Sequence, residues 1–156
     1  MIMNKKGFTL IEMVVSVFMI TIAVVGIVQL TTKYIQTTKF EKESYTAALL
    51  GQEGIEIIKN IRDTNWVEGA ATWNDGLSTD GDYEADYNDS SLSSYDSTHY
   101  LYVDGSGYYN YSSGTKTIYR RKITLANSSD KVSITVTMYW RTNELSVKQD
   151  IYNWKP

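Results

Sequence analysis

The sequence contains no cysteine, a single proline and a single histidine in 156 residues. Without cysteine there is neither a disulfide nor a thiol nucleophile, so an exported domain must be held together by packing and hydrogen bonds. The proline is the last residue, so no proline kink is expected in a helix, and Gly26, Gly51 and Gly54 are the candidate soft points. His99 has no evident metal-ligand partner and is expected at the surface. The sequence also lacks a phosphate loop and a nucleophile elbow, which argues against an enzyme.

One long stretch lacks charge altogether, and a second lacks positive charge. Nothing ionisable occurs from Met13 to Thr32, and neither lysine nor arginine occurs between Arg62 and Lys116. The net charge is −3 and the pI about 5.1, which argues against general binding to nucleic acids through bulk charge. The two stretches are considered separately, the first as a membrane span and the second as an acidic part of the head.

The first uncharged stretch is 20 residues long and mostly aliphatic. As a helix it would span about 30 Å, the thickness of a bilayer core. A secretory signal peptide is disfavoured, because its apolar part is shorter and no Ala-x-Ala cleavage site follows this stretch. A buried helix of a soluble protein is disfavoured as well, because the stretch lacks a polar stripe. Glu12 directly precedes this stretch, where placing a carboxylate near the bilayer core costs free energy unless a partner neutralises it.

The residues around Glu12 form a recognisable pattern, Lys5-Lys6-Gly7-Phe8-Thr9-Leu10-Ile11-Glu12, followed by the apolar run. This pattern resembles the N-terminus of type IV pilins and the related pseudopilins. The resemblance implies cleavage after Gly7 by a prepilin peptidase, N-methylation of Phe8, and a role for Glu12 in assembly. The implied partners are other pilin or pseudopilin subunits, the peptidase and methylase, the cytoplasmic membrane and a pilus assembly platform.

The chemistry of these residues fits the resemblance. Cleavage after Gly7 leaves a cationic amine on Phe8, and Phe8 and Glu12, four residues apart, share a helix face. Between two chains, the amine of one could neutralise the carboxylate of the other and fix the register of packing. The alternative is a plain signal anchor whose glutamate reaches the interface. The basic pair Lys5 and Lys6 predicts a single-pass inner-membrane topology with the N-terminus inside, before display in a pilus at the cell surface.

Four segments follow from these patterns: a leader (1–7), a transmembrane or filament-core helix (8–30), an amphipathic helix (31–65) and a globular head (66–156). The helix is expected from about Phe8 to about Arg62, ending where the turn formers Asp63, Thr64 and Asn65 occur. Docking of its second half on a sheet is preferred to a coiled-coil stalk, because the period is imperfect. The predicted fold class is α+β, with a long helix on an antiparallel sheet, the pilin fold.

Strand patterns fill the C-terminal third. Residues 132–140 alternate strictly, 141–144 form a turn, and 145–151 continue in a partner strand. A further strand is expected over 117–125, followed by a polar loop, and the glycine-containing segment 104–107 predicts a hairpin between 100–103 and 108–111. Three to five strands on one helix are predicted.

A second resemblance is carried by residues 50–66, 136–140 and 152–154, which are similar to minor pilins of the type IV pilus modification class. It implies a minor pilin subunit and no catalytic residue. The alternatives are a pseudopilin of a type II secretion system and a membrane-anchored binding module that never polymerises. Many heads of this family have a disulfide-closed loop, which this chain cannot form.

The segment 69–98 is rich in Gly, Ser, Asp and Tyr. Its densest acidic part has alternating carboxylates at Asp80, Asp82, Glu84 and Asp86, which could coordinate a calcium ion. The resemblance adds that some pilins and pseudopilins hold calcium in this part of the head. No other cofactor is expected. The spacing is not that of an EF-hand, and the alternative is a solvated acidic loop with a strand near 83–87.

Thirteen tyrosines and four tryptophans raise the question of a binding surface. The tyrosines at 108, 109 and 111, together with Arg120, Arg121 and Lys122, could contact DNA or a surface ligand. Aromatic packing across strands is the preferred interpretation of these residues.

Overall fold

The structure is a computed structural model that describes residues 7, 9–128 and 130–153. By its internal contacts the chain divides into two compact units, residues 1–42 and residues 43–156. One helix, α1 (Leu10–Glu68), precedes eight strands. The strands are β1 (Gly81–Glu84), β2 (Ser93–Ser94), β3 (Tyr102–Val103), β4 (Tyr109–Asn110), β5 (Thr115–Lys116), β6 (Tyr119–Ser128), β7 (Lys131–Trp140) and β8 (Asn143–Tyr152).

The C-terminal end of α1 lies beyond the predicted one. The helix continues through Asp63, Thr64 and Asn65 to Glu68 and ends at Gly69, whose φ is +71°. The backbone N–H of Ala70 donates to the Asn65 carbonyl at 2.9 Å, which is the 6→1 hydrogen bond of a Schellman cap. The prediction stopped too early because residues that favour turns also tolerate the last helical turn, and only the glycine supplies the left-handed cap.

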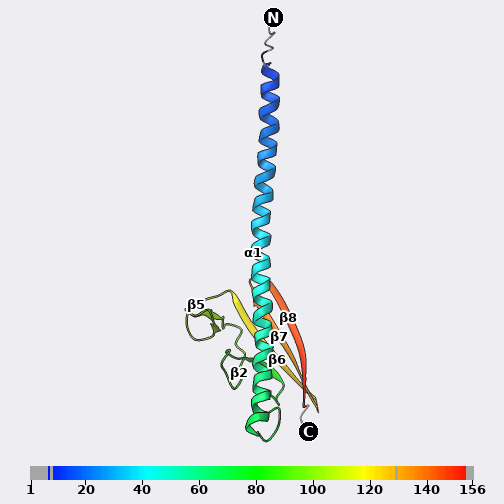
Figure 1. The fold of residues 1–156 in the computed structure, drawn as a ribbon, viewed down its shortest axis with the longest axis vertical. Coiled ribbons are helices and arrows are strands. Elements are labelled where there is room, and N and C mark those ends of the chain that lie inside the picture. The colour runs from blue at the N-terminus through cyan, green and yellow to red at the C-terminus, as the bar shows by residue number, and fades with distance from the viewer. Residues whose placement is uncertain (1–6, 8, 129, 154–156) are drawn as a thin grey trace, which may run out of the picture. The chain divides into compact units, whose positions relative to one another are not determined.

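Strands β6, β7 and β8 form an antiparallel meander, and the complete sheet has the order β2-β1-β6-β7-β8 (Figure 1). Strands β6 and β7 pair along their whole length, beginning with Tyr119 opposite Trp140. Strands β7 and β8 do so as well, beginning with Lys131 opposite Tyr152. Only Arg141 and Thr142 connect β7 to β8, and Arg141 has a φ of 50°, as a tight hairpin turn requires. The alternating pattern at 132–140 therefore predicted β7 correctly.

A second, small sheet has the order β4-β3-β5. The predicted hairpin is present: the Asp104 N–H donates to the Tyr108 carbonyl at 3.0 Å, and Asp104 Oδ1 accepts from the N–H groups of Ser106 and Tyr108. Strand β1 provides the strand expected near 83–87, displaced towards the N-terminus. The α+β fold class is confirmed, with one long helix and antiparallel sheet.

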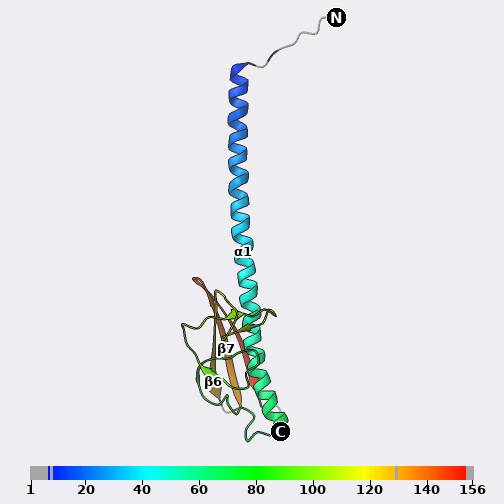
Figure 2. The same cartoon turned by 90° about the vertical axis from the view of Figure 1, so that its left-hand side faces the viewer.

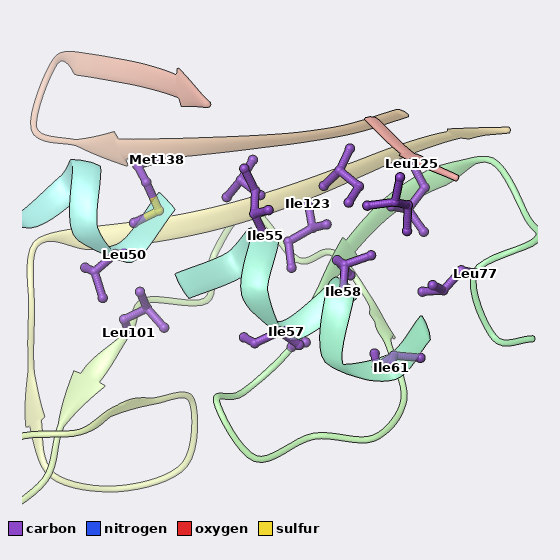
Figure 3. Packing of buried hydrophobic residues seen from close by; sticks show 14 of the residues in the cluster. Leu50, Ile55, Ile57, Ile58, Ile61, Leu77, Leu101, Ile123, Leu125 and Met138 are labelled. Carbon is purple, nitrogen blue, oxygen red and sulfur yellow. The ribbon is translucent and has the colours of Figure 1, made fainter. Parts of the chain in front are cut away.

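Within the second unit, the C-terminal half of α1 lies along the inner face of the sheet (Figure 2). The core is built from aliphatic side chains of the helix, including Leu50, Ile55 and Ile58, against Ile123 and Met138 of the sheet (Figure 3). The buried residues of the described chain lie between Ala47 and Ile151, so this unit has a hydrophobic core of its own. Part of the predicted amphipathic segment 31–65 therefore belongs with the head.

Two helical glycines allow the sheet to approach closely. A Cβ added at Gly54 would lie 2.9 Å from Val136 Cγ1, and one at Gly51 would lie 3.1 Å from Val147 Cγ2. Nothing lies within 4 Å of a Cβ at Gly26. Gly51 and Gly54 are therefore packing positions rather than the soft points that the sequence indicated.

Arg121 is buried beside these glycines, with 1% of its surface exposed. Its Nη1 donates to Glu53 Oε1 at 2.9 Å and to the Leu50 carbonyl at 3.3 Å, and its Nη2 donates to the Ala85 carbonyl at 2.6 Å. These bonds satisfy the two terminal nitrogens of the buried guanidinium, whereas its Nε has no hydrogen-bond partner among the described residues. The side chain thus ties the helix, β6 and the segment after β1 together.

Candidate functional site

The candidate assembly site is the N-terminal end of α1, where Thr9 and Glu12 form a capping box. The Thr9 N–H and Thr9 Oγ1 each donate to Glu12 Oε2 at 2.9 Å, and the Glu12 N–H donates back to Thr9 Oγ1 at 3.3 Å. This reciprocal arrangement satisfies backbone donors that a helix start leaves free. The sequence analysis missed it, although Thr-x-x-Glu before an apolar run is its known signature.

The geometry leaves half of the Glu12 carboxylate free. Both bonds from Thr9 end on Oε2, and Oε1 accepts none of the hydrogen bonds found among the described residues. Glu12 can therefore cap its own helix and still accept a hydrogen bond from a second donor. A cationic donor would make that bond a charge-assisted one.

The helix that follows is suited to an apolar environment. Hydroxyl groups in it are satisfied internally: Ser16 Oγ donates to the Glu12 carbonyl at 2.7 Å, and Thr21, Thr31 and Thr32 donate in the same way to carbonyls four residues earlier. Side chains such as Phe18 and Leu30 are exposed, at 63% and 71%. Helix α1 is long and apolar enough to cross a membrane.

The predicted processing site lies at the limit of the described chain. Gly7 is exposed, lies outside the helix and has nothing within 4 Å of an added Cβ, so its main chain is accessible. Phe8, the predicted methylation site, and residues 1–6 of the predicted leader lie outside the described residues. Cleavage and methylation therefore stay predictions from the sequence.

Comparison with known families gives one match. The family model of the prokaryotic N-terminal methylation motif matches residues 2–28. The chain carries the type IV pilin and pseudopilin signature. No curated protein and no solved structure matches the chain.

The pilin signature implies processing by a prepilin peptidase and assembly with other pilin subunits. Together with the apolar helix, it agrees with membrane anchoring and display at the surface. The match ends before the second unit begins, so the role of the head has to be argued from its own residues.

The four carboxylates of the predicted calcium site are spread along the chain around β1, each with its own donor. Asp80 accepts from the Asn127 N–H at 2.7 Å, and Asp82 accepts from Thr124 Oγ1 at 2.6 Å; these bonds lower the pKa of both carboxyls. Glu84 and Asp86 are engaged elsewhere, with donors described below. Within the described ranges no three acidic or histidine side chains are grouped to hold a metal ion. Calcium binding stays a prediction, and this arrangement does not support it.

Glu84 instead pairs with His99, a contact that the sequence analysis missed. His99 Nδ1 lies 2.7 Å from Glu84 Oε1, and Asp96 Oδ2 lies 3.5 Å from Nε2. Glu84 is buried, whereas about half of the His99 side chain is exposed. The hydrogen bond to the Glu84 carboxylate and its charge raise the pKa of His99. The two residues are fifteen positions apart, with β2 between them, and no sequence spacing indicates the pair.

The tyrosines at 108, 109 and 111 and the cations at 120–122, candidates for contact with DNA, are not all exposed on one surface. Tyr109 packs edge-on against Tyr119, and Tyr111 is largely buried, so that its pKa is raised to about 12. The Tyr111 hydroxyl donates to the Arg121 carbonyl at 3.2 Å, and Arg121 is itself buried. Aromatic packing, the preferred interpretation, accounts for these residues, whereas Tyr108 is exposed and stacks on Tyr87.

Proposed function

We propose that this chain is a structural subunit of a type IV pilus or a related filament, and that it is a minor pilin. The observation that carries the proposal is the methylation motif at residues 2–28, placed directly on a capped apolar helix. In this proposal the prepilin peptidase cuts after Gly7 and Phe8 is methylated. The processed subunit, anchored with its N-terminus on the inner side of the membrane, then packs its apolar helix against those of other subunits on an assembly platform.

Glu12 supplies the register of this packing. Its Oε1 is available, so the positively charged terminus of a neighbouring subunit at Phe8 can pair with it while Oε2 keeps the cap. Lipid tails are as apolar as the helix, so burial alone gives little preference for one helix packing over another. A single polar contact in an apolar interface gives that preference, as polar positions do in coiled coils.

The minor pilin assignment rests on the similarity of residues 50–66, 136–140 and 152–154 to minor pilins. Residues 50–66 form the last turns of α1 and residues 136–140 the C-terminal half of β7, and both contribute side chains to the core. A pseudopilin of a type II secretion system and an anchored, non-polymerising binding module are the alternatives. The proposal includes no catalytic role.

Substitution of Glu12 by glutamine separates charge pairing from capping. Glutamine serves at the third position of a capping box as glutamate does, so E12Q keeps the helix start and removes only the charge. We expect E12Q to be lost from sheared filaments as completely as Glu12→Ala, at unchanged amounts in the membrane. Immunoblots of filament and membrane fractions give the measurement.

The matched control is Thr9→Ala, which removes the capping hydroxyl and keeps the carboxylate. We expect T9A to enter filaments far better than E12Q. Wild-type incorporation of E12Q would show that the charge is not needed, and a filament-free wild type with a stable, displayed head would favour the anchored module.

A further inference from the structure

We propose that the head has a binding pocket for an uncharged sugar ring, beside the stacked pair Tyr87 and Tyr108. The pocket has a volume of about 150 Å³ and is lined almost wholly by polar side chains: Asp86, Tyr87, Asn88, Asp104, Asn110, Ser112 and Ser113. It lies entirely within the second unit, and the inference does not depend on filament assembly.

Tyr87 provides the aromatic part of the lining, and Tyr108 stacks on it from outside the lining. Their ring centroids are 5.0 Å apart with an interplanar angle of 16°, and Tyr87 and Tyr108 are 43% and 55% exposed. Each ring covers one face of the other, so the outer faces remain for contact with an apolar ligand face. Rigid tyrosines give such contact area at low cost in conformational entropy.

The floor of the pocket contains a buried amide with unused donors. Asn110 is only 6% exposed, and its Oδ1 accepts from the N–H groups of Ser112 and Ser113 at 2.9 and 2.8 Å. These bonds fix which way the amide faces. Its Nδ2 donates none of the hydrogen bonds found in the part of the chain that the structure describes, so it can donate to a ligand.

The carboxylates complement that donor. Asp86 Oδ1 accepts from the Tyr111 N–H at 2.8 Å, and Asp104 Oδ1 accepts from Ser106 and Tyr108, which orders both loops. The Oδ2 atoms of Asp86 and Asp104 take part in none of the hydrogen bonds found among the described residues. Fixed acceptors and donors beside an aromatic wall match the hydroxyls and the apolar C–H face of a sugar ring.

Charge and size narrow the class of ligand. The pocket is lined by two carboxylates and no cation, and no lysine or arginine occurs between Arg62 and Lys116, which disfavours phosphodiesters and acidic polymers. Its volume is below the roughly 300–1,000 Å³ of sites for drug-sized ligands, so it admits a single ring. A neutral sugar residue at the end or in the chain of a glycan satisfies both conditions.

The test is titration of the solubilised full chain with methyl glycosides of glucose, galactose, mannose and N-acetylglucosamine, followed by saturation-transfer NMR. The detergent must be zwitterionic, because glycosidic detergents would themselves present sugars. We expect at least one glycoside to bind, and Tyr87→Ala to weaken its binding by about threefold to tenfold, through the loss of one aromatic contact. Asn110→Asp, which removes the amide donors, should abolish binding.

Tyr152→Ala is the matched control, since Tyr152 is similarly exposed, at 51%, on β8. Thermal unfolding of each variant verifies that its fold is intact. The proposal is overturned if none of the four glycosides binds, if Tyr152→Ala weakens binding as much as Tyr87→Ala, or if only a thymidine oligonucleotide binds.

Discussion

Replacing Gly54 by alanine should destabilise the head, although alanine is the better helix former. In an open helical position the exchange gains up to about 1 kcal/mol. Here the new Cβ lies 2.9 Å from Val136 Cγ1 and 3.1 Å from Arg121 Cδ, and both side chains are fully packed. Overpacking a core typically costs about 1–3 kcal/mol, so the clash outweighs the gain in propensity.

The expected net loss is about 1–2 kcal/mol, which corresponds to a fall in Tm of about 4–15 °C for a head of this size. The assay is thermal unfolding followed by circular dichroism in detergent, where loss of the sheet signal reports the head. Gly51→Ala is the graded control, because its Cβ would meet Val147 Cγ2 at 3.1 Å, on a half-buried side chain that can move. A Tm for Gly54→Ala equal to or above that of the wild type would refute the close-packing interpretation of both glycines.

Two further predictions concern the cap and the buried acid. Gly69→Ala should cost about 1–2 kcal/mol, because it forces a side chain into the left-handed region at φ +71°, and urea unfolding of the variant would measure it. The pairing of His99 with Glu84 raises the pKa of His99, so its contribution to stability is complete below the unfolded pKa of about 6.5 and is lost as the pH rises through the higher folded value. His99→Gln should therefore lower the Tm at pH 5 more than at pH 8, and equal losses at both would contradict the pairing.

The elements that the sequence predicted well are those in which one local pattern decides the structure. Apolar and polar residues alternate strictly in β7, which predicts a strand with one buried and one exposed face. The segment Asp104-Gly105-Ser106-Gly107 favours a hairpin whatever surrounds it. The apolar run predicted a helix because a helix satisfies all the backbone hydrogen bonds of a membrane span within one segment. Glu12 could also be singled out, although its partner within the chain was overlooked.

The details that the sequence did not predict depend on contacts between distant segments. Arg121 reads as a surface cation in a β-strand, and only the approach of Gly54 and the Ala85 carbonyl makes its burial possible. Likewise, Asp80 and Asp82 look like ligands for one ion, but Asn127 and Thr124 of β6 engage them separately. Propensity and spacing carry no information on such long-range pairs.

The pocket beside Tyr108 illustrates the same limit. Its seven lining residues come from three separate segments, 86–88, 104 and 110–113. Exposed and buried tyrosines have identical sequence signals, so Tyr108 could not be told from Tyr111 before the structure placed one at the surface and the other against Arg121.

The most direct test of the central claim is the intact mass of the chain recovered from membranes that contain a prepilin peptidase. The account predicts a chain that begins at Phe8 and carries one added methyl group, which leaves a positively charged terminus to meet Glu12 of a neighbour. A chain that still begins at Met1 in sheared filaments would contradict it, because no such terminus would then exist.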